Sequence, residues 1–410
     1  PQKTQKVGFF DMKGSSKRRR RENYRQSAVR NCILATRTRR GVFANDFDAS
    51  DERAAKRRFF KIPENPMLYS LIRSFLFRLD PETAHALIMN NIDWASAVRA
   101  TRLVCPAPVS HPVEVMGLRF PNAVGLAAGM DKTAAHVSSL GSLGFGHIEV
   151  GTITPREQAG NPKPRCWRLI PAQGIVNHMG FNNCGADKAI VNLASAKAYR
   201  AKGGIVGINI GKQNSTAVAD ALPDYVECMK KLTEHADYLA IDISCPNTPG
   251  LTRLQEADAL EPLVAGIAAE RDRQADRLGR RVPITIKIGP DLADETLKRV
   301  ADLFVRYEMD AVTATNTTVS RKGVEHLEKS ENPGGLSGKP LFERSTEVVR
   351  ILSDHLKGEL PIIAVGGVMT AEDAVAKMEA GASLVQLYTG FIYSGPALIA
   401  ACAEAIGRRG

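Results

Sequence analysis

The sequence predicts an α/β protein, a (β/α)8 TIM barrel with an N-terminal two-helix cap and a basic N-terminal extension. Short apolar segments alternate with helical stretches from residue 115 onward, and polar or glycine residues follow each apolar segment. The excess positive charge is confined to the start of the chain. We therefore expect three parts: a polybasic arm at 1–60, an amphipathic helical cap at 61–105 and a barrel at 106–410.

The predicted arm, residues 1–60, carries all of the net charge. It holds 17 basic and 6 acidic residues, which accounts for the net charge of +11 of the 410-residue chain. Blocks of like charge are typical of tails. Three interpretations stay open: a solvated tail, a remnant of organelle targeting, and an arm that neutralises phosphates. RNA is favoured over lipid as its partner, because the segment lacks the apolar face of an interfacial helix.

The composition of the whole chain excludes several other classes of protein. Hydrophobic residues make up 44% and charged residues 24%, which is ordinary for a folded globular protein. No apolar run approaches the roughly 18 residues that a membrane-spanning helix needs. The seven cysteines contain no C-x-x-C pair. Neither a disulfide framework nor a metal site is therefore indicated, and a reducing compartment fits best.

The cap, residues 61–105, is predicted to contain two helices. Apolar residues recur at helical spacing between Met67 and Leu79. Asp80 is a suitable N-cap and Pro81 a suitable first residue for a second helix, which carries His85. Two interpretations stay open here. The helices pack simply on the barrel, or they form a slot for membrane lipid or a lipid-soluble ligand.

The barrel is predicted from eight apolar segments. Strands that are apolar on both faces belong to a parallel sheet covered by helices, and eight of them indicate a closed barrel. The stretch 152–180 is long for one connection and is expected to form a lid. The predicted strands are Ala123–Leu126, His147–Val150, Ile205–Ile210, Tyr238–Ile243, Ile284–Ile288, Ala311–Thr315, Ile362–Val365 and Leu384–Leu387.

The polar residues that follow these strands are expected to meet at one rim, where barrel enzymes carry their chemistry. Glycines after the last two strands, such as Gly367, allow backbone amides to approach a phosphate. Lys132 and Lys287 add positive charge, and several asparagines can donate and accept hydrogen bonds. This mixture favours a planar, polar, anionic heterocycle as ligand. Cys245, just past a strand, is interpreted as a base or nucleophile, with a small buried hydrophobic residue as the alternative.

Motifs across the barrel indicate a family. They are Gly125-Leu-Ala-Ala-Gly-Met-Asp-Lys132, Glu149-Val-Gly-Thr152, Asn161-Pro-Lys-Pro-Arg165, Met179-Gly-Phe-Asn-Asn183, Asn209-Ile-Gly-Lys212, Cys245-Pro-Asn-Thr-Pro-Gly-Leu251, Ala314-Thr-Asn-Thr-Thr318, Gly334-Gly-Leu-Ser-Gly338 and Leu387-Tyr-Thr-Gly390. Through them the chain, from about Met67 to its end, resembles the quinone-dependent (class 2) dihydroorotate dehydrogenases. The resemblance does not cover residues 1–60.

The resemblance implies an FMN enzyme that oxidises dihydroorotate to orotate in pyrimidine synthesis, with ubiquinone as electron acceptor and Cys245 as catalytic base. It implies a quinone slot lined by His85, Arg168 and Tyr388. The implied substrate contacts are Lys132, Asn177, His178, Met179, Gly180, Phe181, Asp242, Asn247, Asn316 and Thr317. The implied FMN contacts are Ala128, Gly129, Met130, Asp131, Lys132, Thr152, Asn209, Asp242, Lys287, Thr315, Gly338, Gly367, Tyr388 and Thr389.

Several residues depart from the family pattern in the site itself, and the two main ones are Cys245 and Asp242. Cys245 stands where the quinone-dependent members have a serine base, although a thiol of pKa about 8.5 is a better base than a hydroxyl. Asp242 stands where the family has an asparagine that contacts flavin and substrate. Like charges about 4 Å apart repel by roughly 4 kcal/mol at an effective dielectric of about 20. We therefore expect Asp242 to weaken orotate binding unless it is protonated or paired.

These departures, beside a basic arm, leave an alternative function open. It is an enzyme-derived, inactive barrel recruited as a structural subunit of an RNA–protein particle such as a mitochondrial ribosome. The active dehydrogenase is favoured over this alternative. The expected location is the mitochondrion, at the inner membrane or in the matrix, with the bacterial inner membrane as second choice and peripheral membrane contact in either case.

Overall fold

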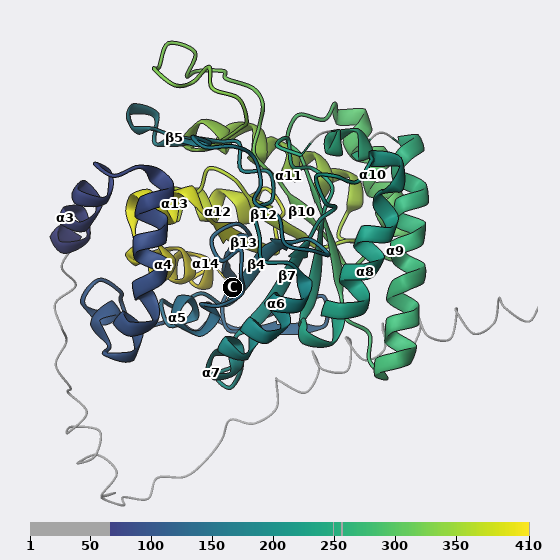
Figure 1. Cartoon of the computed structure of the whole chain (residues 1–410), viewed down its shortest axis with the longest axis horizontal. Helices are drawn as coiled ribbons and strands as arrows, with labels where there is room; N and C mark the ends of the chain where they lie inside the picture. The colour runs from purple at the N-terminus through teal and green to yellow at the C-terminus, as the bar shows by residue number, and fades with distance from the viewer. Residues whose placement is uncertain (1–65, 249, 256, 410) are drawn as a thin grey trace, which may run out of the picture. The chain divides into compact units, whose positions relative to one another are not determined.

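The computed structural model describes residues 66–248, 250–255 and 257–409, which lie within one compact unit, Ile62–Gly410. At its centre, eight parallel strands close into a barrel in the order β10-β12-β13-β3-β4-β7-β8-β9 (Figure 1). The predicted (β/α)8 fold is therefore confirmed. The barrel strands are β3 (Val124–Leu126), β4 (His147–Ile153), β7 (Ile205–Ile210), β8 (Tyr238–Asp242), β9 (Ile284–Ile288), β10 (Ala311–Ala314), β12 (Ile362–Val365) and β13 (Leu384–Leu387).

Burial on both faces explains why these segments form the barrel. Every residue of β4, β8 and β9 is buried, because one face packs in the barrel interior and the other against the surrounding helices. The helices of the barrel and its rim are α5 (Val137–Gly141), α6 (Ala186–Asn192), α7 (Lys197–Arg200), α8 (Ala221–Leu232), α9 (Ala257–Leu278), α10 (Asp294–Arg306), α11 (Phe342–Leu356), α12 (Ala371–Glu379), α13 (Thr389–Ser394) and α14 (Ala397–Gly407).

The cap consists of α3 (Pro66–Leu76) and α4 (Pro81–Ala97), which stand beside the barrel next to α13 (Figure 1). The Asp80 side chain accepts hydrogen bonds from the amides of Glu82 and Thr83, both at 3.0 Å, and Pro81 follows it. These are the start signals expected from the sequence. The Tyr69 hydroxyl donates to the Ile392 carbonyl at 2.7 Å, which attaches α3 to α13.

A small antiparallel sheet covers the rim of the barrel. It contains β5 (Cys166–Leu169), β6 (Gly174–Asn177) and β11 (Gly335–Gly338), in the order β11-β6-β5. Part of the predicted lid at 152–180 therefore forms two strands, and a third comes from far along the chain. A separate hairpin, β1 (Val113–Val115) and β2 (Leu118–Phe120), precedes the first barrel strand.

The predicted arm, residues 1–60, lies outside the described residues, so its binding of RNA or membrane stays a prediction. The division into arm, cap and barrel likewise stays a prediction. Within the described part of the chain, none of the helices combines the length and apolar character needed to cross a bilayer.

Candidate functional site

One large cavity opens at the carboxyl ends of the barrel strands and continues under the cap helices. Its volume is about 1210 Å³, and it is lined mainly by apolar surface with polar groups gathered at the barrel mouth. Cap residues such as His85 and rim residues such as Asn316 line the same space. A cavity of this size holds more than one small molecule, since typical ligand pockets measure roughly 300–1,000 Å³.

Glycines build a cradle where β12 and β13 end side by side. These two strands are neighbours in the barrel, as the sequence predicts for a phosphate site. Gly367 has φ +76° and Gly338 has φ +91°, conformations that side chains rarely adopt. A Cβ atom on Gly367 would collide with the Phe342 backbone. The Thr389 hydroxyl lies 2.8 Å from that of Ser337 at the same place. The cradle leaves backbone and hydroxyl groups free to approach a phosphate.

A cluster of amide side chains occupies the middle of the cavity. Asn247 donates to the Asn177 side chain at 3.0 Å, and Asn177 ends β6 of the covering sheet. Asn316, just after β10, donates to both carboxylate oxygens of Asp242, at 3.2 and 3.3 Å. Thr317 and Phe181 also line this part of the cavity. Amides that both donate and accept are suited to the edge of a pyrimidine-like ring.

Two titratable groups border the amide cluster. Cys245 lies just past β8 and is buried, and this burial raises the pKa of its thiol to about 12, with the nearby Asp242 adding to the rise. Lys132 donates to the Gly129 carbonyl at 2.5 Å. Burial lowers the pKa of Lys132 to about 8. Once it has lost its proton, Cys245 can act as a proton acceptor, and the Lys132 ammonium group can anchor an anion.

The cap side of the cavity carries a different set of groups. Burial, with Lys132 as a smaller cause, lowers the pKa of His85 to about 4, so its imidazole is neutral at physiological pH. Arg168 donates to the Leu79 carbonyl at 2.8 Å, and its guanidinium lies 4.7 Å from the centroid of the Phe77 ring. The Tyr388 hydroxyl donates to the Gly129 carbonyl at 3.3 Å and joins this side to the rim.

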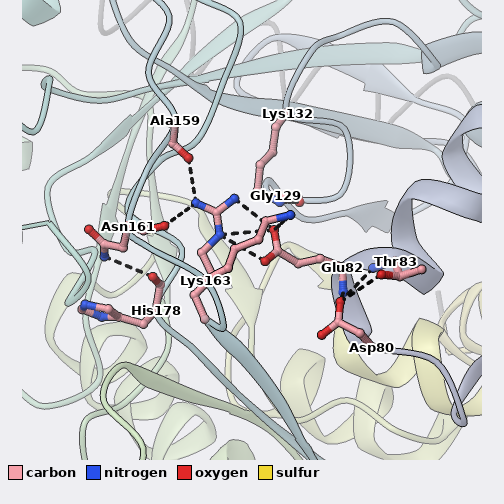
Figure 2. Close-up of polar contacts among 10 residues, drawn as sticks. Asp80, Glu82, Thr83, Gly129, Lys132, Ala159, Asn161, Lys163 and His178 are labelled. Carbon is pink, nitrogen blue, oxygen red and sulfur yellow. Dashed lines mark hydrogen bonds and ion pairs between the residues drawn. The ribbon is translucent and has the colours of Figure 1, made fainter.

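An ion pair connects the cap with the loop around Ala159 and Asn161, which touches the amide cluster at Asn247 (Figure 2). The Arg165 guanidinium donates to both oxygens of Glu82 on α4, at 3.0 to 3.2 Å, and its remaining amino group donates to the carbonyls of Ala159 and Asn161, each at 2.7 Å. The Asn161 side chain then donates to the His178 carbonyl at 3.0 Å. Arg165 was not singled out as a site residue from the sequence, although it ends one of the family motifs.

The structure gathers most of the implied site residues around the cavity and sets two apart. Asn209 is fully buried and does not line the cavity; its side chain donates to Glu149 at 2.9 Å. His178 lies behind the amide cluster, with Nδ1 3.3 Å from the Asn247 side-chain oxygen. The lining includes Ala128, Gly129, Met130, Asp131, Lys132, Thr152, Asn177, Met179, Gly180, Phe181, Asp242, Cys245, Asn247, Lys287, Thr315, Asn316, Thr317, Gly338, Gly367, Tyr388, Thr389, His85 and Arg168.

Sequence reasoning missed Gln386 and Ser337, which also line the cavity. Gln386 lies within the apolar segment of β13, and its side chain donates to buried Glu149 at 2.9 Å. Its place as a polar residue in the middle of an apolar segment is the signal that could have identified Gln386 from the sequence. Ser337 belongs to β11, which carries no strand pattern of its own.

Fold and site together define the class: a (β/α)8-barrel enzyme with a glycine cradle and an amide-lined pocket at the carboxyl rim. Residues 111–409 match the family described as Dihydroorotate dehydrogenase, and the chain belongs to that family.

The relatives support the same assignment. A Dihydroorotate dehydrogenase (quinone) of Teredinibacter turnerae is 52% identical over 339 residues, which span 83% of this chain and 99% of the relative. One of Dechloromonas aromatica is 52% identical over 340 residues, 83% of this chain and 98% of the relative. The crystal structure of DHODH in complex with ferulenol from Eimeria tenella has a TM-score of 0.72 and 35% identity, covering 80% of this chain and 90% of that one.

These matches bear on the two functions that the sequence left open. They support the dehydrogenase, and they give no support to a structural role in an RNA–protein particle. The two relatives named above are bacterial, which agrees with the second choice of location and offers nothing for the mitochondrion.

Proposed function

We propose that this protein oxidises dihydroorotate to orotate with FMN as cofactor and ubiquinone as electron acceptor. One observation carries the proposal. A single cavity contains a glycine cradle, an amide cluster with a lysine and a cysteine, and an apolar slot under the cap. A phosphorylated flavin, a pyrimidine and a lipid-soluble acceptor need these three environments within reach of one another.

The residues at the rim fit FMN on structural grounds. A Cβ atom at Gly338 or Gly367 would collide with the backbone of Gln173 or Phe342, so only glycine allows the close backbone packing of this cradle. The buried side-chain oxygen of Gln386, which lines the cavity, has no hydrogen-bond partner among the described residues. Such groups are costly unless a ligand or water pairs with them. When bound, FMN supplies the acceptor for the hydride of the substrate, and Lys287 in the cavity wall adds positive charge near its ring.

The remaining rim residues bind the pyrimidine and move its proton. Lys132 attracts the substrate carboxylate, and the side chains of Asn177, Asn247 and Asn316 fix the ring by hydrogen bonds. Cys245 removes the proton from the carbon next to the one that loses the hydride. Burial of this group excludes water from the reacting atoms.

The cap residues serve the acceptor. His85, neutral at physiological pH, and Arg168 line the apolar slot with Tyr388. Leu71, Phe75 and Trp94 leave 57–69% of their surface exposed on α3 and α4. Exposed apolar side chains on a cap above a slot are suited to contact with a membrane that contains quinone. We place the protein at the bacterial inner membrane, as a peripheral protein.

The experiment for this function begins with the purified protein. We expect flavin absorbance that bleaches when dihydroorotate is added without oxygen, and that returns when a short-chain ubiquinone is added. Protein that binds flavin but is not reduced by dihydroorotate would contradict the proposal.

The arm at residues 1–60 is proposed to bind polyanions through its 17 basic residues. If it neutralises six to ten phosphates, RNA affinity falls by roughly 10³–10⁵ between 50 and 200 mM salt. RNA and anionic vesicles are titrated with the full chain and with a variant that lacks residues 1–60. Equal RNA affinity in both proteins would refute this proposal, and a preference for vesicles would replace RNA by membrane.

A further inference from the structure

The carboxylate of Asp242 is the feature of the cavity that the proposed chemistry does not use. It lies at the carboxyl end of β8, lines the cavity and is 3% exposed. Oδ1 accepts from the Ser244 amide at 3.0 Å and from the Ser244 hydroxyl at 3.2 Å. Among the residues that the structure describes, Oδ2 accepts only from Asn316, at 3.2 Å, and this donor is shared with Oδ1 at 3.3 Å. One oxygen is thus well supplied with donors and the other is not.

The charged groups around Asp242 do not neutralise the negative charge of its carboxylate. Lys287 on β9 is its partner in the strand register, but no ion pair within 4 Å forms at Asp242 among the residues that the structure describes. Burial raises the pKa of Asp242, and Glu149 on β4, a second buried acid, adds a smaller rise. From α8, the Tyr225 hydroxyl donates to the backbone carbonyl of Asp242 at 2.7 Å and leaves the carboxylate untouched. The Cys245 thiol, three residues on, provides no positive charge.

An anionic ligand makes this imbalance worse. A pyrimidine carboxylic acid brings a negative charge into a cavity that already holds a buried carboxylate. Like charges about 4 Å apart cost roughly 4 kcal/mol at an effective dielectric of about 20. Burial already raises the pKa of Asp242, which Lys287 opposes only in part. Both effects favour the uncharged acid in the ligand complex.

We propose that Asp242 binds the anionic pyrimidine as a neutral carboxylic acid, so that a proton is taken up from solvent when the ligand binds to the ionised site. This inference rests on the proposed function. In this step the Asp242 carboxylate takes one proton from solvent and becomes the neutral acid, while the pyrimidine binds as an anion. Oδ2, with its single shared donor, is the oxygen that carries the proton.

The neutral acid changes what Asp242 can do for the ligand. A carboxylate only accepts hydrogen bonds, whereas the acid also donates one through its hydroxyl. Oδ1 continues to accept from Ser244, and the Oδ2 hydroxyl can donate to a carbonyl of the pyrimidine ring. A buried acid kept neutral so that it donates is a known solution in enzyme sites. Asp242 thereby becomes a binding residue whose strength depends on pH.

Calorimetric titration of the flavin-loaded protein with orotate tests this inference. The titration is run between pH 6 and 9 in two buffers of different ionisation enthalpy, which gives the number of protons taken up. We expect uptake by the wild type that approaches one proton more than by Asp242→Asn. Orotate affinity of the wild type should fall by up to about tenfold per pH unit relative to that variant, because one proton is linked to binding.

Controls separate Asp242 from the other titrating groups. Lys132 must be protonated to attract orotate, so it adds the same uptake to both proteins above its pKa of about 8. Glu149→Gln removes the other buried acid and should keep the difference in proton uptake. The infrared difference spectrum on orotate binding should gain a neutral carboxylic acid band in the wild type that is absent from Asp242→Asn.

The outcomes are distinct. Equal proton uptake by wild type and Asp242→Asn, together with no acid band in the wild type, overturns the inference while the proposed function stands. Uptake lost in Glu149→Gln assigns the proton to Glu149 and also overturns it. Absence of orotate binding in every protein contradicts the proposed function itself.

Discussion

The rim of the barrel and the cap line one cavity but differ in what they place there. At the rim, Cys245 and Asp242 are buried and Lys132 is half-buried, and desolvation shifts the pKa of each of them. In the cap, several of the exposed side chains of α3 and α4 are large and apolar, such as Leu71 and Trp94. This difference supports the proposal that the two halves of the reaction take place in separate regions: proton and hydride transfer at the rim, and entry of the acceptor through the cap.

The Glu82–Arg165 ion pair is where these regions meet (Figure 2). Glu82 belongs to α4 of the cap, whereas Arg165 holds the loop carbonyls of Ala159 and Asn161 beside the amide cluster. Variants in the rim, in the cap and at this junction should therefore affect different steps, and the following predictions test that separation.

The largest effect is expected from Cys245→Ala. General bases contribute about 10²–10⁴ in rate, so flavin reduction by dihydroorotate should slow by about 10² or more while the flavin stays bound. Stopped-flow absorbance without oxygen measures this rate. Cys402→Ala, which removes a buried thiol on α14 away from the cavity, is the matched control. Unchanged reduction in Cys245→Ala would move the role of base elsewhere.

The junction is tested by Glu82→Gln. The side chains of Glu82 and Arg165 are 15% and 7% exposed, so loss of this charged contact should cost about 2 kcal/mol of unfolding free energy. Urea unfolding measures it. Glu404→Gln breaks an exposed pair with Arg408 and should change stability little. Equal effects of the two variants would show that the ion pair does not join cap and rim.

The third prediction concerns pH. Burial raises the pKa of Cys245 to about 12, so the thiol is protonated at neutral pH and the rate of flavin reduction should rise up to tenfold per pH unit. Asp242 adds to that rise only while it is ionised, and it is neutral in the proposed ligand complex, so Asp242→Asn should leave the profile at saturating dihydroorotate unchanged. Reduction rates of both proteins between pH 6 and 9 measure the two profiles. A rate that does not rise with pH in the wild type, or a shifted profile in the variant, would contradict the account.

The smallest effect is expected in the cap. Leu71→Ser and Phe75→Ser remove exposed apolar surface from α3 and should weaken binding to quinone-containing vesicles several-fold. The rate of flavin reduction should stay unchanged, because neither residue reaches the rim. Vesicle sedimentation and stopped-flow reduction are measured on the same preparations. Slower reduction in these variants would break the separation of the two regions.

Much of this arrangement was predictable from the sequence. The eight predicted barrel strands were confirmed. They could be predicted because a strand buried on both faces gives a short, continuous run of apolar residues in the sequence. The second cap helix was confirmed because Asp80 and Pro81 mark its start. The residues after the strands converge because parallel strands present their carboxyl ends at one rim.

Other features depend on contacts that no local pattern carries. The covering sheet joins β6 to β11, whose four residues include two glycines and give no strand period. The Asn209 side chain donates to buried Glu149 and does not line the cavity, because the pairing of β4 with β7 brings these two residues together. The same holds for Arg165, whose partner Glu82 lies 83 residues earlier in the chain.

The central claim is that the rim oxidises dihydroorotate and the cap admits the acceptor. The most direct test is a two-stage stopped-flow experiment on one flavin-loaded protein, first with dihydroorotate and then with a short-chain ubiquinone. The account predicts that Cys245→Ala slows only the first stage and that Arg168→Ala slows only the second. A protein in which each variant slows both stages equally would contradict it.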